Sequence, residues 1–367
     1  MAYIDQFFEV VINAGASDLH LAQGQPPKIR RHGEVVPIRN EVLTEEEMAY
    51  MMSEISGMER WERYVKTGDL DFAYEMDEHS RFRCNFLKQA HGYACVYRLI
   101  PTKILTLEQL GIPEVVKEFG KYRAGLVLVT GPTGSGKSTT LAALIDYINT
   151  NFTKHIITVE EPIEFVHKSK RSVITQREVP ENAASFPAGL KAALREDTDI
   201  VLVGEMRDLE TIQLALTAAE TGLLVFGTLH TNNARKTVDR MIDVFPSSQQ
   251  PQVRTMLSAS LRGIVAQLLM KKVGGGRIAV NEILIANNAV SSIIREGAVE
   301  KLTDVLVSGK SEGMQFMDDA INSLLQQGVV NAEEAYMKAI DKSRFAPYLT
   351  GQMGEIAKGG AKGKPKH

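Results

Sequence analysis

Hydrophobic and polar positions at the start of the chain follow short, local patterns. Apolar side chains recur at helical spacing in residues 4–12, which predicts an amphipathic helix. Residues 17–21 then alternate like a short strand, and residues 81–98 read as a β-hairpin with Phe82, Cys84 and Phe86 on one side. These elements predict a small α+β domain over residues 1–100, followed by a linker containing Pro and Gly over 101–122.

From residue 123 the pattern changes to short, continuous apolar runs, at 126–129, 156–159, 200–203 and 223–226. Such runs are typical of strands that are buried on both faces of a parallel sheet. Helical patterns lie between them, as at Leu141, Leu144, Ile145 and Ile148. The alternation predicts a doubly wound α/β domain over 123–350, mostly helical from about 251 to 340, with a disordered basic tail over 351–367.

The composition of the chain adds limits to this picture. Its 367 residues allow two domains, and 44% hydrophobic with 24% charged residues is typical of a globular protein. A net charge of −3 provides no basic field for nucleic acid, and no apolar run approaches the roughly 18 residues of a membrane span. The N-terminus lacks the basic start of a secretory signal, and two cysteines cannot form a four-thiolate zinc site. We therefore expect a cytoplasmic protein, with peripheral attachment to a membrane machine left open.

A glycine-rich loop follows the first apolar run and precedes an amphipathic helix. It reads Gly131, Pro132, Thr133, Gly134, Ser135, Gly136, Lys137, Ser138. Glycines let backbone N–H groups converge on phosphate oxygens, and the helix presents its positive end to them. In such a loop the lysine reaches the β- and γ-phosphates and the serine hydroxyl binds Mg²⁺. The loop in this context predicts an ATPase that uses ATP and Mg²⁺.

Polar side chains follow each of the other apolar runs. Glu161 comes after the second, Glu205 after the third and His230 after the fourth. Ligands of open parallel sheets bind beyond the carboxyl ends of the strands, so we expect these groups to meet the nucleotide. Glu205 is the predicted base for the attacking water, and His230 would sense the γ-phosphate or orient Glu205. Gly204 stands where a metal-associated Asp is usual, so the predicted metal ligands are Ser138 and Glu161.

Two arginines, Arg83 and Arg98, lie on the predicted hairpin, outside the nucleotide domain. Motors of this chemistry often stabilise the transition state with an arginine supplied in trans. From the residues alone, a solvated surface charge is the simpler interpretation of each arginine.

Four motifs in order give the chain a specific resemblance, namely Gly131–Thr139, Thr158–Phe165, Leu194–Asp208 and Gly227–Asn233. They resemble the Walker A, Asp box, Walker B and His box of the secretion-superfamily ATPases. The segments 17–27 and 313–318 resemble the type IV pilus retraction branch, the PilT/PilU family involved in twitching motility. The resemblance covers roughly residues 3–345, nearly the whole chain.

The resemblance implies an N-terminal PAS-like domain joined to a RecA-like ATPase domain. It implies a homohexamer that acts on an inner-membrane platform protein at the base of the pilus machine and drives pilus disassembly. It adds Thr139 to the nucleotide-binding loop and matches Arg83 and Arg98 to arginines that contact nucleotide phosphates. Lys191 and Arg195 stand where relatives carry basic residues that face the site.

The branch of the family follows from what the chain contains. Assembly and type II secretion relatives usually carry an extra N-terminal domain and a four-cysteine metal motif. This chain has two cysteines and no room for the extra domain, so we expect it to belong to the retraction branch. Two motifs depart from the pattern. Glu161 replaces an Asp in one, and Ser291 and Ser292 replace the Arg and Asn of the Ala-Ile-Arg-Asn-Leu-Ile motif in the other. The second departure keeps open an accessory, PilU-like role beside a second retraction ATPase. The sequence also leaves room for a nucleic-acid-dependent RecA-like motor, or for a nucleotide-binding regulatory partner with little turnover.

Overall fold

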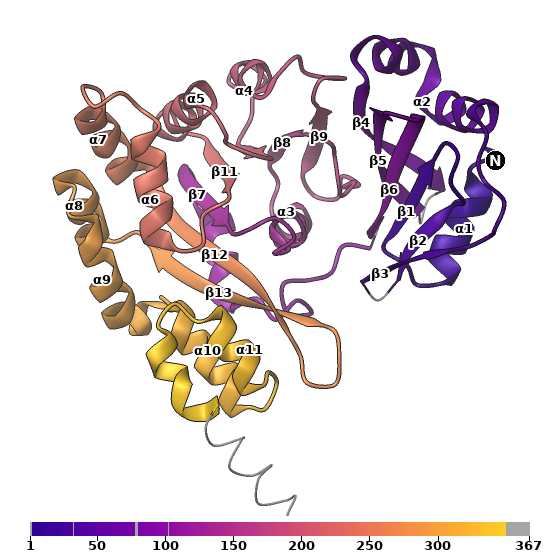
Figure 1. Ribbon diagram of the computed structural model, residues 1–367. Helices are drawn as coiled ribbons and strands as arrows, with labels where there is room; N and C mark the ends of the chain where they lie inside the picture. Colours follow the sequence, from indigo (N-terminus) through magenta and orange to yellow (C-terminus); the bar gives the residue numbers. More distant parts are fainter. Residues whose placement is uncertain (1, 32, 78–79, 102, 350–367) are drawn as a thin grey trace, which may run out of the picture. The chain divides into compact units, whose positions relative to one another are not determined.

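The computed structural model describes residues 2–31, 33–77, 80–101 and 103–349. By their internal contacts these residues form two compact units (Figure 1). The first unit contains the residues up to Ile104 together with Glu160–His167 and Glu178–Pro180, and the second contains the others.

The first unit is built on an antiparallel sheet, six-stranded in its described part, in the order β3-β2-β1-β6-β5-β4. Its strands are β1 (Asp18–Ala22), β2 (Lys28–Arg31), β3 (Glu34–Pro37), β4 (Asp69–Asp77), β5 (Ser80–Gln89) and β6 (Gly92–Pro101). Two helices pack with it, α1 (Asp5–Asn13) and α2 (Glu45–Thr67). The predicted N-terminal helix, short strand and hairpin are confirmed.

Alternation along the strands gives the first unit its core. Phe82, Cys84 and Phe86 of β5 are fully buried and pack with Tyr97 of β6 and Phe8 of α1. The intervening side chains are charged or polar and share the other face of the sheet, because successive residues of a strand point to opposite sides. This second face carries the two arginines that the sequence singles out.

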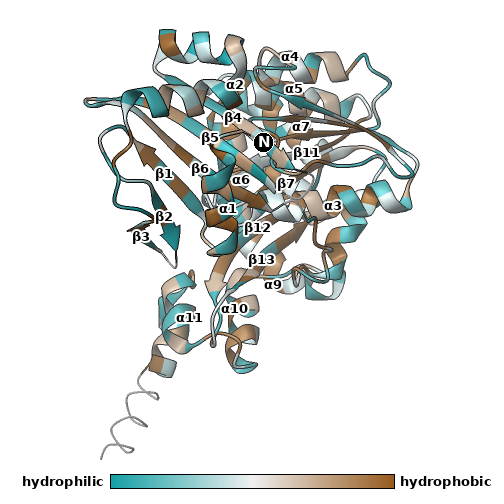
Figure 2. Ribbon diagram, turned by 90° about the vertical axis from the view of Figure 1, so that its right-hand side faces the viewer, coloured by the Kyte–Doolittle hydropathy of each residue, from teal (hydrophilic) through white to brown (hydrophobic). Residues whose placement is uncertain are grey.

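The second unit contains a sheet of seven described strands in the order β13-β12-β7-β11-β10-β8-β9. The strands are β7 (Gly125–Thr130), β8 (His155–Glu160), β9 (Val173–Glu178), β10 (Ile200–Val203), β11 (Leu224–Leu229), β12 (Leu261–Lys271) and β13 (Arg277–Ile285). The central strands are parallel, and their buried, apolar residues account for the largely brown ribbons of Figure 2. The four predicted strands are confirmed at β7, β8, β10 and β11.

Helices cover both faces of this sheet, as a doubly wound fold requires. One hydrophobic cluster packs α3 (Lys137–Asn151) and the 3₁₀ helix η1 (Glu114–Lys121) against it. The cluster on the other face includes residues of α4 (Phe186–Ala193), α5 (Leu209–Glu220), α6 (Ala234–Asp243), α7 (Gln250–Ser260), α8 (Asn288–Glu296), η2 (Val299–Lys301) and α9 (Leu302–Ser308). A separate cluster packs α10 (Met317–Gln326) and α11 (Ala332–Lys338) on β12 and β13, and η3 (Gly309–Glu312) precedes α10.

The expectation of a mostly helical region over 251–340 is wrong for residues 261–285. Strands β12 and β13 form a long antiparallel hairpin there, and β12 pairs with β7 in the central sheet. Ile264, Val265 and Ala266 are fully buried because β12 is an interior strand, covered on both faces. Gly274, Gly275 and Gly276, all with positive φ, form the turn and are the signal that the helical interpretation overlooks.

The segment expected to be a linker divides between the two units. The contact boundary falls between Ile104 and Leu105. Residues 105–122 belong to the second unit, where Leu107, Ile112 and Phe119 join the cluster around α3. The predicted tail over 351–367 lies outside the described residues.

Candidate active site

The phosphate-binding loop lies between β7 and α3, where the sequence predicts it. Gly131, Gly134 and Gly136 have backbone φ angles of 147°, 76° and 84°, which residues other than glycine rarely adopt. Gly136 is the N-cap of α3 and so offers no side-chain acceptor to the first N–H groups of the helix. Those groups and the positive end of the helix dipole point to an anion site at the start of α3.

Two side chains of the loop are arranged for a phosphate ligand. The Lys137 ammonium lies within the curve of the loop and donates to the carbonyls of Gly131 at 2.8 Å and Pro132 at 3.2 Å. The hydroxyl of Ser135 is buried and has no hydrogen-bond partner among the described residues. A loop whose lysine side chain folds back to the loop's first carbonyls, with an unsatisfied buried hydroxyl beside it, fits a bound phosphate group.

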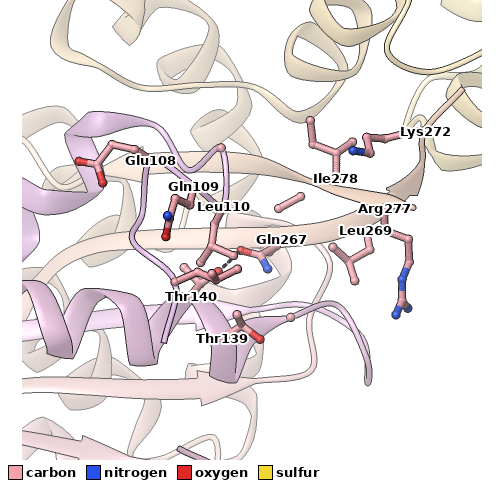
Figure 3. Close-up of a pocket in the computed structure, with 14 residues that line it drawn as sticks. Glu108, Gln109, Leu110, Thr139, Thr140, Gln267, Leu269, Lys272, Arg277 and Ile278 are labelled. Atoms are coloured by element: carbon pink, nitrogen blue, oxygen red, sulfur yellow. Dashed lines mark hydrogen bonds between the residues drawn. The ribbon is translucent and has the colours of Figure 1, made fainter. Parts of the chain in front are cut away.

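A pocket of about 390 Å³ opens beside the loop, within the second unit (Figure 3). Gly136, Thr139 and Thr140 line it from the loop and α3. Its apolar wall includes Leu105, Leu110, Leu269 and Ile278, and two cations, Lys272 and Arg277, stand at the hairpin side. An apolar pocket with a few polar groups, next to a phosphate loop, has the character of a site for a base and sugar.

Strand register brings the predicted catalytic groups to one edge of the sheet. Residue 203 of β10 pairs with 159 of β8 and 227 of β11, and Leu229 of β11 pairs with Thr130 of β7. Glu205 and His230 follow two neighbouring strands, and His230 Nε2 lies 2.9 Å from Glu205 Oε1. The structure therefore joins these two residues, at the edge from which the phosphate loop also leaves the sheet.

Arg207, to which the sequence interpretation assigns no role, completes this cluster. Its Nε lies 2.5 Å from Glu205 Oε1 and its Nη2 donates to Glu205 Oε2 at 2.6 Å. Burial alone would raise the pKa of Glu205, but the contacts with Arg207 and His230 outweigh burial and the pKa lies below its ordinary value. Glu205 is therefore a carboxylate at neutral pH, able to accept a proton. The only sequence signal for Arg207 is that it lies in the Gly-Glu-Met-Arg-Asp motif, two residues after Glu205.

The glycine that stands in place of a metal-associated Asp has a structural part in the cluster. Gly204 N donates to Val159 O at 2.8 Å, and its carbonyl accepts from the Thr228 hydroxyl at 2.5 Å. These bonds hold the ends of β8, β10 and β11 together directly before Glu205. The backbone at Gly204 thus fixes the direction in which the Glu205 side chain leaves the sheet.

The two basic residues implied by the resemblance differ in their surroundings. Lys191 of α4 donates to Glu210 of α5 at 2.6 Å, and both side chains are exposed. Arg195 follows the end of α4 and is exposed. The role of Arg195 in the site stays a prediction.

In the first unit, Arg83 and Arg98 are direct cross-strand partners on β5 and β6. Each arginine binds its own carboxylate, which offsets the repulsion between them. Arg83 Nη2 lies 2.5 Å from Asp71 Oδ2, and Arg98 Nε donates to Asp18 Oδ1 at 2.8 Å. The Arg98 side chain is 64% exposed, so most of its surface faces solvent. The contact of either arginine with nucleotide stays a prediction.

The predicted metal ligands fall in different units. Ser138 is exposed in the first turn of α3, in the second unit. Glu161 follows β8 but belongs to the first unit. There the hydrogen bond with Asp71 raises the pKa of Arg83 against the opposing effect of burial, and the charges of Glu164 and Glu161 add smaller increases. Among the described residues no group of three or more His, Cys, Asp or Glu could hold a metal ion.

Comparison with known proteins places the chain in a family. Residues 1–338 match the family described as type II/IV secretion system protein. The chain is 49% identical over 325 residues to the type IV pilus retraction ATPase PilT of Pseudomonas aeruginosa, covering 89% of this chain and 94% of that protein. It is 36% identical over 336 residues to the type IV pilus ATPase PilU of the same organism, covering 91% of this chain and 88% of PilU.

Among solved structures, the crystal structure of the pilus retraction motor PilT with bound ADP is similar, with a TM-score of 0.86 and 41% identity. The match covers 94% of this chain and 98% of that one. The chain thus belongs to the type II/IV secretion system protein family of nucleotide-using ATPases. Within that family it is a member of the pilus retraction group that contains PilT and PilU. The predictions of family, two-part fold and ATPase activity are confirmed. No described helix has the length and apolar character that crossing a bilayer demands.

Proposed function

We propose that this chain hydrolyses ATP with Mg²⁺ and uses the energy to power type IV pilus retraction. The hydrolytic part of the proposal rests on the Glu205–His230 pair. The two side chains lie 2.9 Å apart at the carboxyl ends of the parallel strands, where the phosphate loop also begins. The 49% identity to PilT supports the mechanical part. In this proposal the loop from Gly131 to Thr139 holds the phosphates and the neighbouring pocket takes the adenosine.

Glu205 is the proposed general base for the attacking water. Its side chain is 19% exposed and its carboxylate is ionised, so it can orient a water molecule and take up its proton. His230 approaches the same carboxylate oxygen that Arg207 contacts and fixes the direction of the group. Arg207 keeps the pKa of Glu205 low, and its own side chain is 65% exposed.

The residues at the start of α3 fit a magnesium ion bound chiefly through phosphate and water. Mg²⁺ in nucleotide sites keeps several waters and takes one or two protein oxygens, and the exposed Ser138 hydroxyl offers such an oxygen. When bound, the ion would neutralise charge on the β- and γ-phosphates. Glu161 is the proposed second ligand, directly or through water.

Arg83 and Arg98 are the proposed transition-state arginines. They lie side by side on one face of the first unit, and Asp71 and Asp18 orient their guanidinium groups. In a homohexamer, arginines of this kind stabilise charge that develops on the transferred phosphoryl group. Arg195 would add positive charge from the second unit. We further propose that the ring lies in the cytoplasm and acts on an inner-membrane platform protein of the pilus machine.

An accessory role beside a second retraction ATPase is the second candidate function. The observation in its favour is the surface of α8, where Ser291 and Ser292 replace Arg and Asn. Ser292 donates to Glu296 at 2.8 Å on the partly exposed side of the helix, while Val290 and Ile294 are buried. Identity to PilT exceeds identity to PilU, which favours the main motor.

Two experiments test these proposals. Purified chain should hydrolyse ATP with Mg²⁺, without stimulation by single-stranded DNA or RNA. Salt-sensitive stimulation would support a nucleic-acid motor, and no hydrolysis above background would support a regulatory partner. A deletion strain should have excess pili and no twitching if this chain is the main motor. Normal piliation with a small defect in force would support the accessory role.

A further inference from the structure

The segment Gly313–Asp318 resembles the retraction family but has no part in the nucleotide site. It leads into α10, and its residue Gln315 pairs with β13 through both backbone bonds to Ile283, of 2.8 and 3.0 Å. The Gln315 side chain turns to the same strand and donates from Nε2 to the carbonyl of Asn281 at 2.7 Å. These three bonds fix the start of α10 to one position on β13.

From Asn281 the hydrogen bonds continue to the next strand. Asn281 and Gln267 are cross-strand partners of β13 and β12, and Asn281 Nδ2 donates to Gln267 Oε1 at 3.0 Å. The same oxygen accepts from the Thr140 hydroxyl of α3 at 2.8 Å, drawn as a dashed line in Figure 3. Both side-chain amides are buried, at 1% exposure for Gln267 and 2% for Asn281. Buried amides with this number of partners have a single orientation.

Gln267 is also the residue against which the phosphate loop rests. Its Nε2 donates to the carbonyl of Ser135 at 2.7 Å. A Cβ at Gly131 would lie 2.2 Å from the backbone carbonyl oxygen of Gln267. A Cβ at Gly136 would lie 3.0 Å from the side-chain Nε2 of Gln267. Two glycines of the loop are therefore needed for close approach to Gln267, in addition to their part in phosphate binding.

We propose that Gln267 is a positioning residue for the phosphate loop, and that Gln315 sets nucleotide affinity through Asn281 and Gln267. This inference rests on the proposed ATP site. A displacement of the segment before α10 would change the bond to Asn281, the orientation of Gln267 and then the position of the Ser135 carbonyl. The affinity for nucleotide would thereby depend on the position of α10 and α11, which pack together on β12 and β13.

The test is a double-mutant cycle read out by the Kd for ADP of the full chain. Gln267→Met and Gln315→Met keep side-chain length and remove the amide bonds. Gln327→Met, at the exposed C-cap of α10, is the matched control. We expect Gln267→Met to raise Kd by about tenfold and Gln315→Met by about threefold or more, in line with buried hydrogen bonds. Gln327→Met should leave Kd unchanged.

The decisive result is that of the double variant. Since Gln315 acts through Gln267, the double variant should match Gln267→Met alone, with strong non-additivity. Additive effects, or a Gln315→Met Kd equal to that of Gln327→Met, would overturn the proposal. If Gln267→Met did not fold, the comparison of Gln315→Met with Gln327→Met would decide alone. Absence of ADP binding by the wild-type chain would instead reject the proposed function itself.

Discussion

Replacing Gly131 with Ala is a perturbation whose effect can be worked out from the structure. The new Cβ would lie 2.2 Å from the Gln267 carbonyl oxygen and 2.6 Å from the Ser135 hydroxyl, at a φ of +147°. The unfavourable φ costs about 1–3 kcal/mol, and the overpacking against a rigid strand adds about 1–3 kcal/mol. The free energy of unfolding should therefore fall by about 2–6 kcal/mol.

Gly134→Ala is the matched control, because Gly134 has a φ of +76° but nothing within 4 Å of its Cβ position. In Gly134→Ala the free energy of unfolding should fall only by the cost of the unfavourable φ angle, about 1–2 kcal/mol. The assay is the Tm of both variants without nucleotide, so that phosphate contacts do not enter the comparison. Gly131→Ala should lower Tm more than Gly134→Ala does, by about two- to threefold at the middle of the two energy ranges. An equal or larger effect of Gly134→Ala would refute the reasoning that β12 sets the loop's shape.

The lysine of the loop, the arginine pair and a buried glutamate each give a further test. Lys137→Ala should weaken ADP binding about 10–100-fold in calorimetry, because a charged donor to phosphate is lost; an unchanged Kd would refute the loop assignment. Arg83→Ala should lower kcat by about 10³-fold if it acts in the transition state, yet cost only about 1 kcal/mol or less of stability, as its ion pair with Asp71 is part-exposed. An unchanged kcat would return Arg83 to a surface charge. Burial raises the pKa of Glu282 above its ordinary value of 4.5. The contribution of the protonated Glu282 to the free energy of unfolding is therefore fully present below pH 4.5 and is lost as pH rises through the raised pKa. Glu282→Gln should therefore gain stability relative to wild type as pH rises in denaturation experiments, and a pH-independent difference would contradict this.

The parts of the fold that follow from the sequence are those set by local pattern. Short continuous apolar runs that alternate with helical patterns are typical of strands buried on both faces, and so β7, β8, β10 and β11 are predictable. The glycine loop after β7 and the polar groups at the strand ends follow from the same topology. The pairing of Glu205 with His230 is one of the two roles that the pattern predicts for His230.

What could not be predicted depends on partners far apart in the chain. Gln267 donates to a residue 132 positions away, and no spacing rule connects the two. The hairpin of β12 and β13 escapes prediction because a short apolar run has no clear period, and only its glycine turn distinguishes it from helix. Arg207 lies two residues from Glu205, but its ion pair depends on the turn after β10. For Gln267 and the hairpin, tertiary contact decides the outcome, whereas for Arg207 the local backbone of the turn decides it.

Glu205 is the proposed base of the ATP-hydrolysing site. Glu205→Gln keeps the side-chain size and removes its charge, and Glu210→Gln on the exposed surface of α5 is the control. Single-turnover hydrolysis with Mg²⁺ should fall by about 10²–10⁴-fold in Glu205→Gln, as expected when a general base is lost. ATP affinity should stay close to that of wild type, and Glu210→Gln should behave as wild type. Hydrolysis by Glu205→Gln at the wild-type rate would contradict the account and place the base elsewhere.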